Sequence, residues 1–331
     1  MESKDAYTTR MLEEHKELIA EWTREQHSLR KSVLFVDHEL DFFVPTSGSD
    51  FQHEMSVVQH DFDVPEVHQV NIGEPLVTAL KYVGGLDISF VQQSEDSSGM
   101  TESEESQSHV VVTENGPNAY ATLVVVEYPS LELRHTITHA IHMDVPYIPT
   151  FFSYREAPVY LRLINALREE LAARNEQDQF PQVFLIDGNG RLHVRETGVA
   201  SVVGVQANVP TIGVAKNYLP HHQDSLQGQP WATSTAHWRS TQHGMREMIR
   251  RVLLSHGSWF GLYDAKGDSY AGAALIPPTL KAPLFVSPGH RVCLDTAIRV
   301  TLALGRYKIP EPIRLADKIS RAAVAASVTS S

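Results

Sequence analysis

Three acidic residues stand inside or beside predicted secondary structure, where carboxylates can bind a cation. Asp87 interrupts the apolar run 83–91, Glu156 lies at the entrance of a predicted helix, and Asp187 ends the buried run 183–186. An ionised carboxylate inside a strand is strongly unfavourable unless it is paired or binds a metal. Simpler interpretations stay open for two of the three, with Glu156 as a helix-capping carboxylate and Asp187 as a turn former.

These carboxylates have a common chemistry if the fold gathers them. Each then raises the pKa of the others, and a divalent cation removes that penalty. Mg²⁺ is the usual choice for carboxylate and phosphate oxygens, and Mn²⁺ can substitute for it. Such a cation can orient a water, lower its pKa and offset charge on a leaving oxygen. The implied chemistry is hydrolysis of a phosphodiester.

The order of the elements around these acids predicts the fold. The strand with Asp87 is followed by an antiparallel pair, 121–128 and 131–138, then by a helix that starts near Glu156, then by the strand that ends at Asp187. In such a sheet, adjacent central strands bring their ends to one edge, where open α/β sheets bind ligands. We therefore predict an α/β fold, a ribonuclease H-like mixed sheet flanked by helices.

The chain is predicted to form one catalytic domain with additions, which its 331 residues allow. An amphipathic helix at 11–30 precedes this domain, and a polar, acidic stretch between two apolar strands is typical of a disordered loop. The predicted parts are an N-terminal helix and lead-in at 1–43, an irregular insertion at 44–76, a catalytic domain at 77–321 with a disordered loop at 92–118, and a flexible tail at 322–331.

Composition and charge limit the classes of function. No apolar run reaches the ~18 residues of a membrane span, so we expect no membrane partner. The single cysteine, Cys293, excludes an internal disulfide and a thiolate zinc site, and it favours a reducing location in the cytoplasm, the nucleus or both. The net charge of −12 argues against nucleic-acid binding by the whole surface. A local basic surface is predicted at 281–321, because this segment contains eight basic residues, Arg291 among them, and only three acidic ones.

Six short motifs follow one another along the chain. They are Leu86-Asp87-Ile88-Ser89-Phe90, Pro146-Tyr147-Ile148-Pro149, Tyr154-Arg155-Glu156, Asp187-Gly188-Asn189-Gly190 with His193 and Gly198, Gly213-Val214-Ala215-Lys216, and Gly289-His290-Arg291. In this order they resemble the endonuclease V family, from Trp22 to Arg321 apart from the two insertions. The resemblance implies a nuclease that cuts RNA or DNA at inosine, at the second phosphodiester 3′ to that base.

The resemblance also implies roles for the motif residues. Asp87 and Asp187 would be metal ligands, and Glu156 would complete the acidic, metal-binding cluster. His290 would join these three as a catalytic residue by helping to position the attacking water or the scissile phosphate. Lys216 would contact the phosphate.

Substrate binding is implied for a further set of residues. Tyr147 would be a wedge that stacks where the base is withdrawn. The other members are Pro149, Gly188, Gly190, His193 and Gly198, whose glycines would let the backbone surround hypoxanthine. Thr150 departs from the family pattern, which usually has glycine after the Pro-Tyr-Ile-Pro segment.

Three classes of function stay open at this stage. The first is an inosine-specific endonuclease. The long insertions and the scarcity of cysteines favour a eukaryotic or diverged member, for which the resemblance implies single-stranded RNA over deoxyinosine DNA. The second is a reader that binds inosine-containing RNA without cutting, and the intact acids Asp87, Glu156 and Asp187 argue against it. The third is a metalloenzyme acting on a small phosphoester, which Tyr147 and the glycine-rich loop disfavour. No protein partner is predicted.

Overall fold

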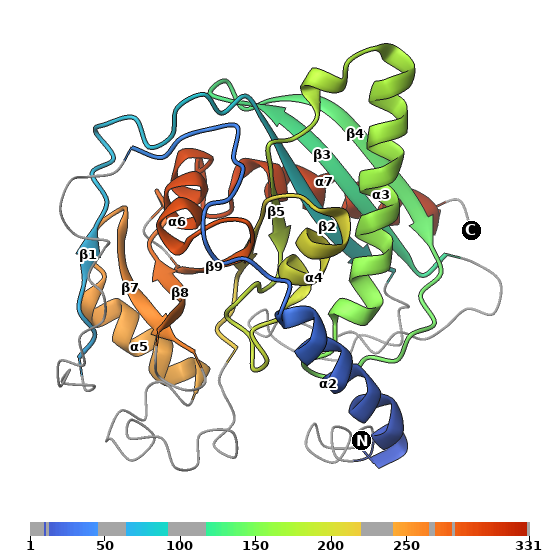
Figure 1. The fold of residues 1–331 in the computed structure, drawn as a ribbon, viewed down its shortest axis with the longest axis horizontal. Coiled ribbons are helices and arrows are strands. Elements are labelled where there is room, and N and C mark those ends of the chain that lie inside the picture. The colour runs from blue at the N-terminus through green and yellow to red at the C-terminus, as the bar shows by residue number, and fades with distance from the viewer. Residues whose placement is uncertain are drawn as a thin grey trace.

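A single mixed sheet organises the described part of the chain (Figure 1). The computed structural model describes residues 10, 13–45, 64–91, 117–219, 241–264, 269–279 and 282–329. Nine strands lie in the order β1-β7-β8-β9-β6-β5-β2-β3-β4, with helices on both faces. This arrangement confirms the predicted α/β fold with a mixed, helix-flanked sheet of the ribonuclease H-like type.

The strands are β1 (His68–Gln69), β2 (Tyr82–Phe90), β3 (Ala119–Glu127), β4 (Glu132–Ile141), β5 (Val183–Asp187), β6 (Thr211–Ala215), β7 (Ser258–Tyr263), β8 (Tyr270–Leu275) and β9 (Leu284–His290). The helices are α2 (Lys16–Arg30), α3 (Ser153–Arg174), α4 (Val199–Ala207), α5 (Gln242–Val252), α6 (Leu294–Ala303) and α7 (Glu311–Thr329), with a short 3₁₀ helix at Gln177–Gln179. None of the helices in these ranges is long and apolar enough to cross a membrane.

The centre of the sheet consists of three parallel strands. β5 lies between β2 and β6 and pairs with both in parallel register. Residues 183–186 of β5 are completely buried, which explains why their sequence is continuously apolar and not alternating. The antiparallel pair β3–β4, predicted from its close spacing, extends the sheet on the β2 side. β9, β8, β7 and β1 extend it on the β6 side.

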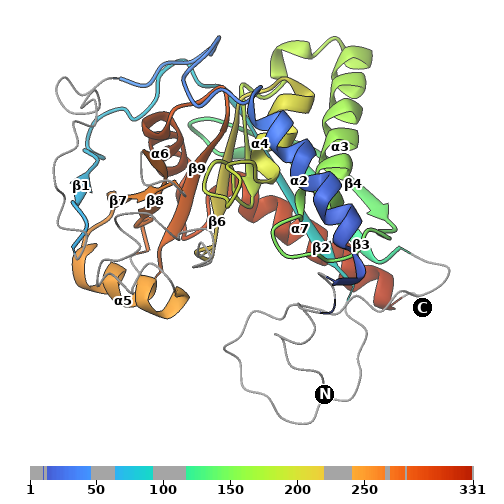
Figure 2. The same ribbon diagram turned by 60° about the horizontal axis from the view of Figure 1, so that its bottom comes forward.

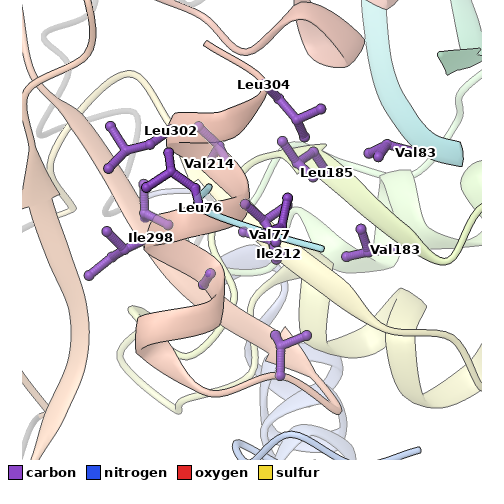
Figure 3. Close-up of a cluster of buried hydrophobic side chains, with 14 of the residues drawn as sticks. Leu76, Val77, Val83, Val183, Leu185, Ile212, Val214, Ile298, Leu302 and Leu304 are labelled. Carbon is purple, nitrogen blue, oxygen red and sulfur yellow. The ribbon is translucent and has the colours of Figure 1, made fainter. Parts of the chain in front are cut away.

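Alternate side chains of the central strands supply two separate cores. Val183 and Leu185 pack in a cluster that includes Ile298 of α6 and residues of α7 (Figure 3). Phe184 and Ile186 point the other way, into a cluster with α3 and α4. Viewed from below, α2, α3 and α4 cover one face of the sheet, while α6 lies on the other (Figure 2). Side chains of this size each contribute about 1.5–3 kcal/mol when fully buried, so β5 is firmly fixed.

The C-terminal segment differs from its prediction. α7 continues to Thr329, so the flexible tail predicted at 322–331 is wrong for residues 322–329. Four of these residues are alanine, which has the highest helix propensity, and α7 packs along β2 and β3. A run of small residues therefore extends a docked helix.

The two predicted insertions are described only at their ends. Residues 46–63 of the first and 92–116 of the second lie outside the described ranges. After residue 63 the first segment is not irregular throughout, because β1 pairs with β7 and both Val70 and Leu76 are buried in the core. The end of the predicted insertion thus belongs to the folded domain.

Candidate active site

Two of the predicted acids meet because their strands are parallel neighbours in fixed register. Leu86 of β2 pairs with Ile186 of β5, so the next residue of each strand, Asp87 and Asp187, stand side by side. Asp87 is 5% exposed and accepts a hydrogen bond of 3.1 Å from the Ser320 hydroxyl of α7. Burial, followed by the charge of Asp187, raises the pKa of Asp87 to about 8.

The third predicted acid, Glu156, comes from the first turn of α3. Pro158 is the sixth residue of α3 and lies inside the helix, where its missing N–H removes one intrahelical hydrogen bond. Burial, followed by the charges of Asp187 and Asp87, raises the pKa of Glu156 to about 8, although Arg155 opposes the shift. The structure therefore brings together all three carboxyls that the sequence singled out.

Lys216 is the cation of this cluster. Its Nζ lies 2.7 Å from Oδ2 of Asp187, one strand away at the end of β6. Burial disfavours the charged ammonium, but Asp187 and further carboxylates outweigh this effect and raise the pKa of Lys216. The ammonium also lowers the pKa of Asp87, which stays raised nonetheless. One lysine does not neutralise the acids around it.

A fourth carboxyl, Asp317 of α7, was missed by the sequence reasoning. Its charge raises the pKa of both Asp87 and Lys216, so it lies within electrostatic reach of the pair. The backbone carbonyl of Asp317 accepts a 3.0 Å hydrogen bond from Ser320, the residue that also bonds Asp87. The signal in the sequence was faint, a three-residue spacing that places Asp317 and Ser320 on one helix face.

His290 lies away from the three acids, so the structure does not join it to their cluster, and its catalytic role stays a prediction. In the register of β9 against β6, His290 pairs with Thr211, whereas Asp187 is level with Val214. Three residues of strand separate these levels by about 10 Å. The backbone N–H of Leu34 donates to Nδ1 of His290 over 3.2 Å. Burial, with Arg291 and His38 nearby, lowers its pKa to about 4.

A local irregularity accompanies this placement. Proline followed by glycine, as in Pro288-Gly289, is typical of a turn, but β9 continues through these residues to His290. The register shifts between Thr211 and Ile212, and such a bulge accommodates a proline within a strand. α6 begins only at Leu294.

The predicted wedge lies beside Arg155, the residue before Glu156. The Tyr147 ring is partly exposed and packs on Phe152, with ring centroids 4.7 Å apart. The Arg155 guanidinium lies 5.7 Å from the Tyr147 ring and 5.3 Å from the ring of Phe90, the last residue of β2. The neighbouring Ile148 is 1% exposed and anchors the segment, while Pro149 is partly exposed. Tyr147 is therefore placed beside the strand that carries Asp87.

Thr150 and His193 hold this segment together. Thr150 has a φ of 68°, a left-handed conformation in which a β-branched residue is strained. Its carbonyl accepts hydrogen bonds from Nη2 of Arg195 at 2.6 Å and from Nε2 of His193 at 2.9 Å. The backbone N–H of Arg195 donates to Nδ1 of His193, which fixes the proton on Nε2. His193 is 6% exposed, and its contacts give it a positioning role.

The predicted pocket glycines are tightly packed within the protein. A Cβ on Gly190 would lie 2.1 Å from the carbonyl oxygen of Pro288, and one on Gly198 would lie 2.1 Å from that of Asn189. Gly188 has a φ of 144°, which side chains disfavour. Because these glycines have no side chain, the loop after β5 can pack closely against β9 and against its own backbone. Its contact with a base stays a prediction.

The N-terminal helix α2 braces the same region. Nε2 of Gln26, a buried side chain, donates to Oγ of Ser153 at 3.3 Å and to the carbonyl of Thr197 at 3.2 Å. Oε1 of Gln26 accepts from Nε of Arg195, which also binds Thr150. One amide therefore links α2, the start of α3 and the loop after β5.

The donor chemistry of the acidic cluster fits an oxygen-seeking divalent cation. Burial, followed by the charge of Asp187, raises the pKa of both Asp87 and Glu156 to about 8, and a bound cation would offset both effects. Among the described residues, no three acidic, histidine or cysteine side chains already converge as a metal-binding group. Asp87, Glu156 and Asp187 could hold a cation once its charge draws their oxygens closer together.

Two neighbouring carboxyls on adjacent central strands, Asp87 within β2 and Asp187 at the end of β5, are joined by one from a helix on each face, and this arrangement defines a nuclease of the ribonuclease H-like class. More specifically, the chain belongs to the endonuclease V family, because the Endonuclease V family model matches residues 67–318. Human endonuclease V is 33% identical over 248 residues, which are 75% of this chain and 73% of the human one. Membership of this family makes the protein a nuclease.

Solved structures agree with this assignment. The crystal structure of human endonuclease V superimposes with a TM-score of 0.64 at 30% identity, covering 94% of this chain and 99% of the human one. Endonuclease V from Ciona intestinalis, in complex with a DNA that contains an inosine followed by a ribo-adenosine, has a TM-score of 0.65 at 24% identity. That alignment covers 93% of this chain and 97% of the other, and it supports the fold.

Proposed function

We propose that the protein is a divalent-metal-dependent endonuclease that hydrolyses nucleic acid at the second phosphodiester 3′ to inosine. The observation that carries this proposal is the cluster of Asp87, Glu156 and Asp187, in which two carboxyls have a pKa of about 8. The inosine-containing DNA bound by the Ciona intestinalis relative supports the choice of base. Single-stranded RNA is the proposed main substrate, and deoxyinosine DNA the second.

The residues of the chain have separate tasks in this proposal. Asp87, Glu156 and Asp187 hold the cation, which when bound activates a water and offsets charge on the leaving oxygen. Mg²⁺ is the proposed ion, and Mn²⁺ can replace it. Asp317 adds negative charge behind Asp87. Lys216 stays protonated because of the carboxylates around it. Its ammonium is paired with Asp187, and a cation bound by the acids would free it to contact the scissile phosphate.

Matched oligonucleotides test the proposal. Single-stranded RNA and DNA of one sequence, with inosine or adenosine at one position, are incubated with Mg²⁺, Mn²⁺ or excess chelator. We expect one cut in each inosine strand, faster in RNA, and no cut in adenosine strands or with chelator. Binding of inosine RNA without any cutting would instead identify a reader. Cutting that ignores inosine would refute the proposed specificity.

Tyr147→Ala should weaken binding to an inosine strand by roughly 1–3 kcal/mol, the typical contribution of a base stacked on an aromatic ring. The Tyr147 ring is partly exposed beside the acids, where a withdrawn base would leave a gap. Fluorescence anisotropy measures the affinity, and titration calorimetry with Mg²⁺ is the control. A loss of metal affinity with unchanged strand binding would mean that Tyr147 has another role.

Asp317→Asn and His290→Gln should differ in effect although sequence reasoning favoured His290. The first substitution removes a charge that acts on Asp87, and changes behind metal ligands typically reduce metal affinity or activity by about 10–100-fold. The second alters a neutral side chain at the far end of β6, so cleavage should persist. Single-turnover rates compare the two, with melting temperatures as the folding control. The reverse ranking would restore His290 to the active site.

A further inference from the structure

Half of the eight basic residues of the predicted surface at 281–321 are engaged within the protein. Within the described part of this segment, four arginines are paired with acidic groups of the protein itself. They are Arg291 with Glu39, Arg299 with Asp295, Arg314 with Glu311 and Arg321 with Asp317. A chain with a net charge of −12 therefore needs a further basic surface to hold a polyanion.

The outward face of α5 carries arginines that are not neutralised in this way. The helix starts at Thr241, whose hydroxyl accepts from the N–H of Gly244 over 3.0 Å, and it buries Met245 and Ile249 against the sheet. Its exposed residues include three arginines: Arg246, Arg250 and Arg251. In the described ranges neither Arg250 nor Arg251 forms an ion pair, and the one exposed acid of the helix, Glu247, pairs with His243.

This basic face is connected to the active site. Nη2 of Arg246 donates to Oδ1 of Asn217 over 3.1 Å. Asn217 follows Lys216, whose ammonium contacts Asp187. On the opposite side, α2 exposes acidic and basic residues together and no run of unpaired arginines: Glu17, Glu21 and Glu25 alternate with Lys16 and Arg24. α5 and α2 lie on opposite sides of the sheet's centre (Figure 2), so a polyanion is favoured on the α5 side.

The order of residues along this edge also gives the strand a direction. Tyr147 lies with Arg155 beside the end of β2, the acids stand on β2 and β5, and Lys216 follows β6. α5 leads into β7, which lies further along the sheet on the β6 side. If inosine is held at the Tyr147 side, 5′ to the cut, the strand beyond Lys216 is the 3′ portion.

We propose that Arg246, Arg250 and Arg251 of α5 form a phosphate-binding surface that holds the nucleic-acid strand 3′ of the scissile phosphodiester. This inference rests on the proposed function of the acidic site. The arginines recognise the sugar-phosphate backbone and not the bases, so they strengthen binding to inosine and adenosine strands equally. They set the affinity for the strand and leave the chemical step unchanged.

The test compares two double variants with the same change in net charge. R250Q/R251Q removes two arginines of the surface, spares the Arg246–Asn217 contact, and keeps helix-favouring residues. R162Q/R174Q removes two exposed arginines of α3 and is the control. Binding is measured by anisotropy in Ca²⁺, over a range of salt, with single strands extended either 3′ or 5′ of the inosine.

For R250Q/R251Q and the 3′-extended strand, the slope of log affinity against log salt should become shallower by about 1.4, two contacts at roughly 0.7 each. The 5′-extended strand and the control variant should keep the wild-type slope, and the cleavage rate at saturating substrate should be unchanged. An unchanged slope in R250Q/R251Q, or an equal change in R162Q/R174Q, would refute the proposal that α5 binds phosphates. An effect confined to the 5′-extended strand would show that α5 holds the 5′ portion of the strand and not the 3′ portion. If wild-type protein neither binds nor cuts inosine strands, the proposed function itself fails.

Discussion

Asp187→Asn is expected to abolish cleavage while binding to an inosine strand stays measurable. Asp187 stands beside Asp87, acts on the pKa of Glu156 and contacts Lys216, so one charge at its position affects the whole cluster. Asparagine has the same shape but lacks the charge that a cation requires. The rate should fall by more than the roughly 10–100-fold that changes behind metal ligands cause.

A matched control is available on α6. Asp295 is also an ion-paired, partly buried aspartate, 2.9 Å from Arg299, and it lies outside the acidic cluster. Asp295→Asn should keep the wild-type cleavage rate under single-turnover conditions, whatever it does to the melting temperature. Wild-type cutting by Asp187→Asn, or by wild-type protein in excess chelator, would contradict the metal-assisted mechanism.

The central strands could be predicted because each buried strand corresponds to a short, continuous run of apolar residues in the sequence. β5 is completely apolar up to Asp187, and β2 is apolar around Asp87. Two apolar strands in this order pair in parallel, and that pairing alone brings the two aspartates together. The first two members of the acidic site therefore follow from local patterns and one topological rule.

Asp317 could not be predicted in the same way, because its position depends on how a distant helix packs. α7 approaches β2 at Gly85, where a Cβ would lie 2.3 Å from the backbone of Pro312. Gly85 is two residues before Asp87, so the missing side chain lets α7 bring Asp317 and Ser320 towards that acid. No spacing in the sequence records this contact between segments.

The support of the substrate-binding segment was also hidden from the sequence. Thr150 keeps a left-handed conformation although it is not glycine, and hydrogen bonds from Arg195 and His193 hold it there. Gln26 of α2 ties Arg195 in turn to the start of α3. The sequence predicted only an amphipathic helix here, whereas its buried amide braces the segment that carries Tyr147.

The affinity for a divalent cation should rise steeply between pH 6 and pH 8. In the metal-free protein Asp87 and Glu156 have pKa values of about 8, so both are protonated at pH 6. A cation binds ionised oxygens and must displace these protons. Two displaced protons correspond to an affinity gain of up to about 100-fold per pH unit below pH 8.

The same pKa shifts determine whether the metal-free protein gains or loses stability as the pH rises. Both folded-state pKa values lie above the ordinary values of about 4 in an unfolded chain. The native state therefore holds its protons more tightly, and it loses stability as the pH rises from about 4 to 8. Mg²⁺ or Ca²⁺ should counteract this loss, with an increase in melting temperature that is larger at pH 8 than at pH 6.

Titration calorimetry in buffers of different ionisation enthalpy would count the protons released on binding. We expect nearly two at pH 6.5 in the wild type. His290 cannot supply them, because its pKa is lowered to about 4 and it carries no proton to release in this range. Asp187→Asn is the control, since removing its charge lowers the pKa of Asp87 and Glu156 and should reduce the count. An affinity that is flat from pH 6 to pH 8, with no proton release, would show that these two carboxyls do not bind the metal.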